Sequence, residues 1–131
     1  MEIGEDMRSS AAFLFCSLLV AATPVGAQVL RERTRMCQAL VLNMLEGSAI
    51  AAAAADACND LKLKVEQARL AINIAIAVGV DESVAIEVFT REYVTVSKSG
   101  RKCDLDGMIA LGNSFQDTAE QTMDFCSVIA P

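Results

Sequence analysis

Four of the five cysteines in this 131-residue chain lie outside its apolar N-terminal segment: Cys37, Cys58, Cys103 and Cys126. The fifth, Cys16, falls within that segment. An even number of cysteines in a small exported domain indicates a pair of disulfides. Two such crosslinks restrict which helix ends can meet, so the cysteines constrain the fold more than any other feature.

The N-terminal segment has the features of a secretory signal. The uncharged apolar run 11–22 is followed by the small residues Val25 and Ala27, and we predict cleavage between Ala27 and Gln28. A helix of that run spans only about 18 Å, against a hydrocarbon core of about 30 Å, so no stable membrane anchor is expected. The acidic start MEIGED does not suit a signal, whereas translation from Met7 begins with the basic segment MRSS.

Removal of the predicted signal peptide, residues 1–27, leaves a single domain of 104 residues, 28–131, with room for a modest core. The domain keeps 10 basic and 14 acidic residues, a net charge of −4, because one arginine and three acidic residues are removed. It has one tyrosine and no tryptophan. The signal segment predicts a periplasmic or extracellular protein, and the acidic composition makes it a poor candidate for binding nucleic acid or an anionic membrane.

Four helical segments are predicted, and they make an all-α fold, a small up-down four-helix bundle with two disulfides. The first covers about residues 29–45, and we expect its first turn to fray because arginines occupy it. Gly47 weakens this helix. The alanine-rich run 50–55 either continues it or forms a short separate helix, and the sequence leaves both open.

The second segment, from Asn59 or Asp60 to Val78, is widely apolar. Two apolar stripes run along it, and only Gln67 interrupts the second. A helix that is apolar on so much of its surface is normally central, so we expect it to form the core of the bundle. The alternative is that its apolar end binds a partner.

The third segment runs from Glu82 to about Ser97 and the fourth continues to about Val128. Acidic residues lie before or within the first turn of the second, third and fourth predicted helices. A carboxylate there accepts hydrogen bonds from free backbone N–H groups and interacts favourably with the positive end of the helix dipole. The predicted helix caps are Asp60, Asp81, Asp104 and Asp106.

The stretch RKCDLDGMIALGN, residues 101–113, has an alternative interpretation as part of a calcium loop. Asp104, Asp106 and Gly107 match the third, fifth and sixth positions of an EF-hand. Lys102 then occupies the first ligand position, and Asn113 stands where a bidentate glutamate is needed. We therefore expect a capped helix beside a disulfide, with no metal and no cofactor.

Residues 70–93 resemble a helix-turn-helix in the spacing of their small residues. The helix that would read DNA carries four acidic residues against one arginine, Arg91. Such a helix repels phosphates, so an ordinary helical hairpin is the better interpretation.

The chain contains no histidine, so a serine or cysteine nucleophile lacks its usual base and zinc lacks an imidazole ligand. We assign no catalytic residues and expect a non-enzymatic protein that binds another extracytoplasmic protein as an accessory subunit, inhibitor or chaperone. One alternative is a carboxylate-dependent hydrolase, which requires two acids to converge in a pocket. Another is a carrier of an apolar ligand, with a tunnel lined by Met44, Phe89 and Met108.

Helix geometry predicts the pairing of the cysteines. Cys58 and Cys103 precede the second and fourth helices, which start at the same end of an up-down bundle, and Cys126 lies about 30 Å away at the other end. Cys103 and Cys126 are therefore too far apart to form a disulfide. We predict the nested pattern of Cys58–Cys103 inside Cys37–Cys126, although an unbroken helix through 48–58 would favour pairing of Cys58 with Cys37.

Overall fold

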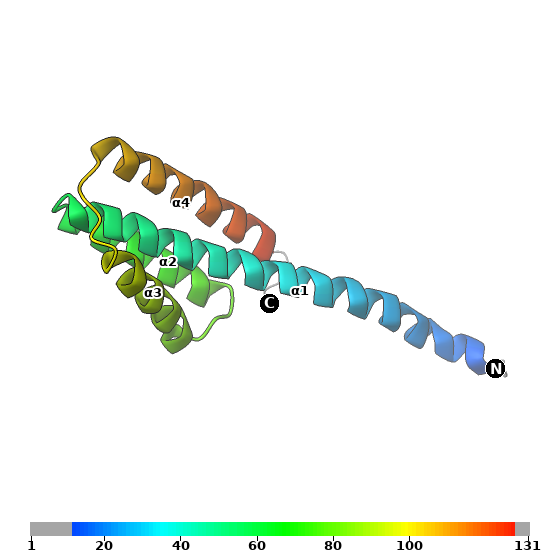
Figure 1. Cartoon of the computed structure of the whole chain (residues 1–131). Helices are drawn as coiled ribbons and strands as arrows, with labels where there is room; N and C mark the ends of the chain where they lie inside the picture. Colours follow the sequence, from blue (N-terminus) through cyan, green and yellow to red (C-terminus); the bar gives the residue numbers. More distant parts are fainter. Residues whose placement is uncertain (1–11, 128–131) are drawn as a thin grey trace. The chain divides into compact units, whose positions relative to one another are not determined.

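The computed structural model describes the backbone of residues 12–127 and the side chains of residues 25–127 (Figure 1). Its elements are four helices: α1 (Ala12–Ala57), α2 (Leu61–Ala77), α3 (Glu82–Ser97) and α4 (Leu105–Cys126). The chain divides into two compact units, residues 1–35 and 36–131, and α1 belongs to both. The acidic start and Met7 lie outside the described residues.

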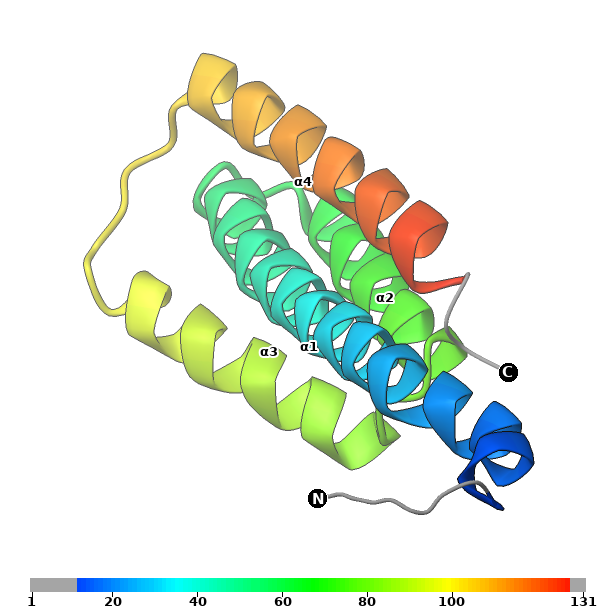
Figure 2. The same cartoon turned by 90° about the vertical axis from the view of Figure 1, so that its right-hand side faces the viewer.

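The C-terminal part of α1 is the centre of the second unit. Helices α3 and α4 lie on opposite sides of it, α2 contacts both, and consecutive helices run in opposite directions (Figures 1 and 2). The consecutive alanines 51–55 are all buried. Five consecutive helical residues point in every direction around the axis, so no side of α1 faces solvent here. Their small side chains let the three other helices approach closely.

The prediction that the second helical segment is central was wrong. Along α2 the side chains of Leu61, Val65 and Ile76 are 61%, 47% and 41% exposed. Its buried residues are Gln67, Ala71, Ile74 and Ala75. The alanine run takes the central place because a helix with short side chains can be surrounded by three neighbours, which leaves α2 with one face in solvent.

Helix α1 is continuous through the alanine run, which resolves the alternative that the sequence left open. In the full chain α1 begins at Ala12, so the arginines at 31–35 lie inside the helix. The predicted start near residue 29 refers to the chain after cleavage at Gln28 and stays a prediction. Gly47 lies inside the helix, and alanine has the highest helix propensity of all residues. The predicted cleavage site between Ala27 and Gln28 lies within α1.

Residues 25–57 of α1 are long and apolar enough to cross a membrane by length and composition. Half of the most apolar window is buried inside the protein. A core helix has the same composition as a membrane span, so this property follows equally well from the central place of α1 in the bundle.

The connection between α1 and α2 is a tight turn closed by backbone hydrogen bonds. Asn59 has a left-handed backbone, with φ 61°. Its N–H donates to the carbonyl of Asp56 at 2.9 Å, and the N–H of Asp60 donates to the carbonyl of Ala55 at 2.8 Å. These two bonds form a Schellman motif, in which asparagine tolerates the left-handed conformation. Asn59 therefore ends α1, and Asp60 begins α2.

The four predicted helix caps differ in the hydrogen bonds that their side chains make. Asp60 accepts a hydrogen bond from the N–H of Leu63 at 3.1 Å, and Asp104 accepts one from the N–H of Gly107 at 3.2 Å. Asp81 occupies the N-cap position of α3, but its side chain makes no capping bond. Asp106 lies in the first turn of α4, where it adds negative charge and does not cap.

Two disulfides link the helices in the nested pattern that the sequence predicts. The Cα atoms of Cys37 and Cys126 are 5.3 Å apart, and those of Cys58 and Cys103 are 4.6 Å apart. The expectation that an unbroken α1 favours pairing of Cys37 with Cys58 was wrong. On one continuous helix these two residues are about 30 Å apart, so the same continuity places them at opposite ends of the bundle.

Candidate binding groove

A surface groove runs between α2 and α4, which start at the same end of the bundle. Its volume is about 280 Å³. Helix α2 contributes side chains at spacings of three and four residues, as one face of a helix must. The lining residues are Leu63, Glu66, Gln67, Leu70, Met108, Ile109, Gly112, Asn113, Phe115 and Gln116.

The carboxamide of Gln67 lies at the floor of this groove. The residue is only 6% exposed, and its Oε1 is buried without a hydrogen-bond partner among the described residues. A Cβ atom on Gly112 would lie 3.0 Å from Gln67 Nε2, so the glycine leaves room for the amide. A buried polar atom without a partner costs roughly 1–3 kcal/mol, which makes Gln67 the most conspicuous polar group of the groove.

The walls of the groove are mainly apolar. Phe115 and Met108 are buried, whereas Leu70 and Ile109 at its edges are 38% and 56% exposed. Glu66 is the single charged residue of the lining. A concave apolar surface with a few convergent polar groups is typical of binding sites, because the apolar part supplies affinity and the polar groups fix orientation.

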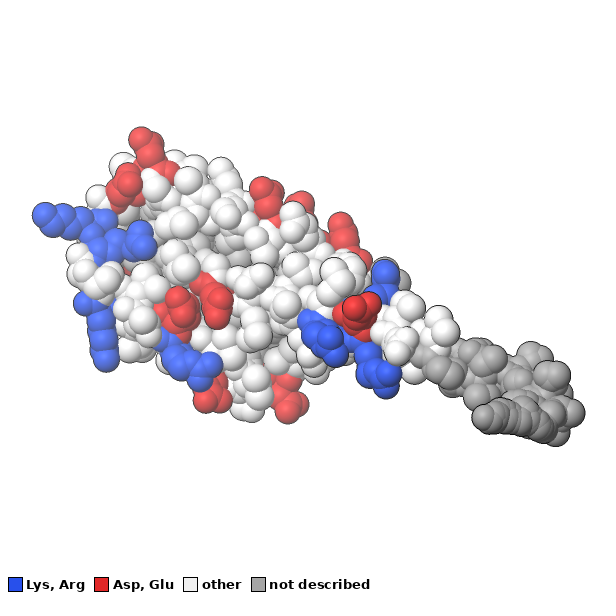
Figure 3. Space-filling model, turned by 45° about the vertical axis from the view of Figure 1, so that its right-hand side comes forward, with Lys and Arg blue, Asp and Glu red and all other residues white. Residues whose placement is uncertain are grey.

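The surface beside the groove is acidic. Helix α4 carries Asp106, Asp117, Glu120 and Asp124 and contains no lysine or arginine. In Figure 3 the edge of the bundle formed by α4 shows acidic side chains (red), while basic side chains gather at the end where α3 leads into α4. The field along α4 therefore attracts cations.

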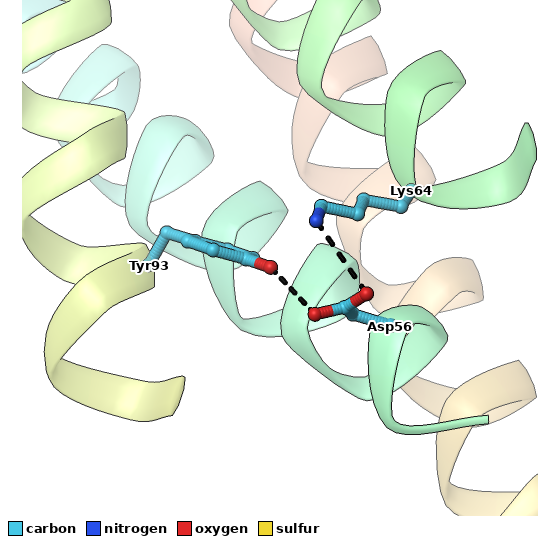
Figure 4. Close-up of polar contacts among 3 residues, drawn as sticks. All are labelled: Asp56, Lys64 and Tyr93. Atoms are coloured by element: carbon cyan, nitrogen blue, oxygen red, sulfur yellow. Dashed lines mark hydrogen bonds and ion pairs between the residues drawn. The ribbon is translucent and has the colours of Figure 1, made fainter. Parts of the chain in front are cut away.

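A second polar cluster joins three helices through Asp56, Lys64 and Tyr93 (Figure 4). The Tyr93 hydroxyl donates to Asp56 Oδ2 at 2.8 Å. Lys64 Nζ lies 3.5 Å from Asp56 Oδ1 and 4.9 Å from the centre of the Tyr93 ring. The ring of Phe89 stacks on Tyr93 at 5.9 Å between centroids.

The cluster shifts two pKa values in the directions expected of stabilised charges. The hydrogen bond from Tyr93, followed by the charge of Lys64, lowers the pKa of Asp56 against an opposing effect of burial. Contact with Tyr93 and then with Asp56 raises the pKa of Lys64. Asp56 stands at the end of α1, where the helix dipole disfavours an anion, so its two partners compensate that cost. The cluster ties helix ends together.

Carboxylates on the helix surfaces form no catalytic pair in the groove. Glu82 and Glu87 on α3 and Asp117 and Glu120 on α4 are all exposed. The groove is lined by one carboxylate, Glu66, so it does not bring together the two acids that a hydrolase needs. Among residues 25–127 there is also no group of three His, Cys, Asp or Glu residues placed to hold a metal ion.

The side chains considered for an apolar tunnel pack in three different places. Met44 is fully buried in the main core, which includes Phe115. Met108 packs in a second cluster with Ala54 and Ala55 and also lines the groove. Phe89 belongs to neither cluster: it is half-buried on α3 and stacks on Tyr93.

In the structure, the stretch 101–113 that partly matches a calcium loop contains the capped start of α4. The Asp104 carboxylate folds over the first turn of α4, and a Cβ atom on Gly107 would lie 2.6 Å from Asp104 Oδ2. A side chain at position 107 would therefore force the Asp104 carboxylate to shift. Cys103, next to it, forms the disulfide to Cys58 that anchors this end of α4.

The sequence analysis did not identify Gln67 as a site residue. The sequence did contain a signal. Gln67 lies at helical spacing from the apolar residues Leu63, Leu70 and Ile74, so it is a polar residue within an apolar stripe. A polar residue in an apolar stripe is either exposed at the edge of the core or buried beside a partner, and the sequence alone does not distinguish the two.

Comparisons with known proteins gave no match to a family model, to a curated protein or to a solved structure.

Proposed function

We propose that this chain is a non-enzymatic binding protein that acts on another extracytoplasmic protein through the groove between α2 and α4. The buried, unpaired carboxamide oxygen of Gln67, a lining residue of this mainly apolar groove, carries the proposal. A partner that supplies a donor there removes a cost of roughly 1–3 kcal/mol that the free protein bears.

The size and openness of the groove favour a protein partner over an enclosed small molecule. Its volume of about 280 Å³ lies just below the range of ligand pockets, which runs from about 300 to 1,000 Å³. Leu70 and Ile109 extend the apolar surface beyond the groove onto both flanking helices. A segment of a partner protein can cover these edges, whereas a small ligand cannot.

The two disulfides indicate an oxidising, extracytoplasmic environment. We place the mature protein, starting at Gln28, in the periplasm or outside the cell. Intact-mass analysis of the exported protein should show a chain that lacks residues 1–27, and an exported form that retains 11–22 contradicts this processing.

Site-specific photo-crosslinking tests the proposed function. A photoreactive amino acid replaces Ile109 at the groove edge, and in the control it replaces Ile86 on α3, which is similarly exposed at 42%. We expect a crosslinked product of defined mass from position 109 in the source organism and none from position 86. No product from position 109, or the same product from both positions, refutes a binding role of the groove.

A further inference from the structure

We propose that the groove between α2 and α4 recognises an arginine side chain of the partner protein, an inference that rests on the proposed function. Glu66 and Gln67 are adjacent on α2 and both line the groove. Along this groove Glu66 offers an exposed carboxylate and Gln67 a buried carboxamide oxygen. The ligand that fits must therefore be a donor with several N–H groups and a positive charge.

Neither acceptor is used within the part of the chain that the structure describes. Gln67 Oε1 has no hydrogen-bond partner there, and Glu66 belongs to none of the ion pairs. A guanidinium carries five N–H donors in a planar fork and is more weakly hydrated than an ammonium. Its five donors are enough for both acceptors, and its desolvation costs less free energy than that of a lysine ammonium.

The apolar walls suit the stem of an arginine. Leu63 and Leu70 on α2 face Met108 and Phe115 on α4 across the groove. The three methylene groups of arginine pack on apolar surface while the charged head reaches a polar partner. The volume of about 280 Å³ admits a side chain of this size without enclosing a larger ligand.

Contact with Gln67 requires a small rearrangement, because Oε1 is buried in the free protein. Met108, only 9% exposed, has three rotatable bonds and is the adaptable wall of the groove. The terminal torsion of Gln67 is also soft. Rotation of either side chain brings the oxygen to the groove surface.

Charge complementarity supports a cationic group from the partner. The acidic residues of α4 produce a field that steers cations toward this side of the bundle. Lys62 and Arg69 are near Glu66 in sequence, but both are exposed, and neither forms an ion pair with it among the described residues. The carboxylate of Glu66 thus remains available to a partner.

Two isosteric probes test the arginine proposal: n-butylguanidinium and the neutral n-butylurea. We would titrate each into the oxidised protein purified after export and follow the amide of Gly112 and the carboxamide of Gln67 by NMR. We expect selective shifts of these two signals with n-butylguanidinium. Equal binding of n-butylurea, or shifts confined to other residues, overturns the proposal, and so does an absence of binding.

Two variants show whether the proposed acceptors are responsible. Gln67→Leu and Glu66→Gln should each weaken n-butylguanidinium binding roughly tenfold, the loss expected for one charge-assisted hydrogen bond. Glu87→Gln on α3 is the control and should bind like the wild type. If Gln67→Leu does not fold, Glu66→Gln, a surface change, decides. Unchanged binding by Glu66→Gln contradicts the proposal.

The outcomes separate this inference from the proposed function. A crosslinked partner at position 109 without selective n-butylguanidinium binding leaves the binding role intact and removes the arginine. Selective n-butylguanidinium binding that depends on Glu66, without a crosslinked partner, supports the chemistry of the site and refutes the protein-binding role.

Discussion

The hydroxyl of Tyr93 on α3 donates a 2.8 Å hydrogen bond to Asp56 at the end of α1. This contact is the largest cause of the lowered pKa of Asp56. A carboxylate with a lowered folded-state pKa stabilises the fold above its unfolded pKa, 3.8, and loses that contribution as pH falls through its folded pKa. Acid should therefore weaken this link between the two helices.

We predict that Asp56→Asn and Tyr93→Phe both reduce stability at pH 7 and lose their effect in acid. Because the Asp56 side chain is 40% exposed, the hydrogen bond should contribute only roughly 0.5–1 kcal/mol. Urea unfolding of both variants and the wild type at pH 7 and pH 2 measures the differences. Differences that are as large at pH 2 as at pH 7 would show that ionised Asp56 is not responsible.

The disulfides should contribute much of the stability. They close separations of 45 and 89 residues, and the chain-entropy model assigns roughly 4 kcal/mol to the shorter loop and slightly more to the longer. A domain of this size has a total stability of about 5–15 kcal/mol, so reduction should loosen or unfold it. Circular dichroism with and without reductant measures this loss.

Peptide mapping without reduction checks the connectivity itself. We expect one linked pair of peptides with Cys58 and Cys103 and another with Cys37 and Cys126. A linked peptide that joins Cys37 to Cys58 or to Cys103 contradicts the nested topology.

The caps should differ in their contribution to stability. Asp60→Ala and Asp104→Ala should each cost about 1 kcal/mol, because each side chain accepts a backbone hydrogen bond. Asp81→Ala is the matched control and should cost less, since its side chain makes no such bond. Thermal unfolding of the three variants measures the differences, and a loss at Asp81 equal to the others would be inconsistent with these geometries.

The same Asp104 variant tests the absence of calcium binding at this helix end. Millimolar calcium should leave the melting temperature unchanged in both the wild type and Asp104→Ala. A rise in the wild type that the substitution abolishes would assign Asp104 to a metal site.

The alanine run should not tolerate larger side chains. Ala52 is fully buried in the centre of the bundle, so Ala52→Leu should cost about 1–3 kcal/mol by overpacking. The same substitution at Ala110, an exposed residue of α4, is the control and should change stability little. Similar stability of the two variants would show that α1 is not enclosed by its neighbours.

The sequence predicted local features more accurately than the packing. The bounds of α2, α3 and α4 follow from caps and turn residues such as Asp60 and Gly79, which act within one turn of the helix. The cysteine pairing also followed, because helix length excludes the bond between Cys103 and Cys126, and the common starting end of the second and fourth helices brings Cys58 to Cys103.

The central helix and the groove could not be predicted in the same way. Apolar periodicity favoured α2 as the core, but burial depends on how closely other helices approach, and short alanines allow closer approach than leucines. The groove depends on the meeting of Gln67 with Gly112, residues from different helices. No local pattern in the sequence specifies that contact.

The most direct test of the account is the affinity of the crosslinked partner for groove variants, measured by calorimetry. Ile109→Lys, at the exposed groove edge, should weaken binding by tenfold or more at roughly 1.4 kcal/mol per tenfold change, with an unchanged melting temperature. Ile86→Lys on α3 should bind like the wild type. Undiminished binding by Ile109→Lys would place the binding surface elsewhere and contradict the account.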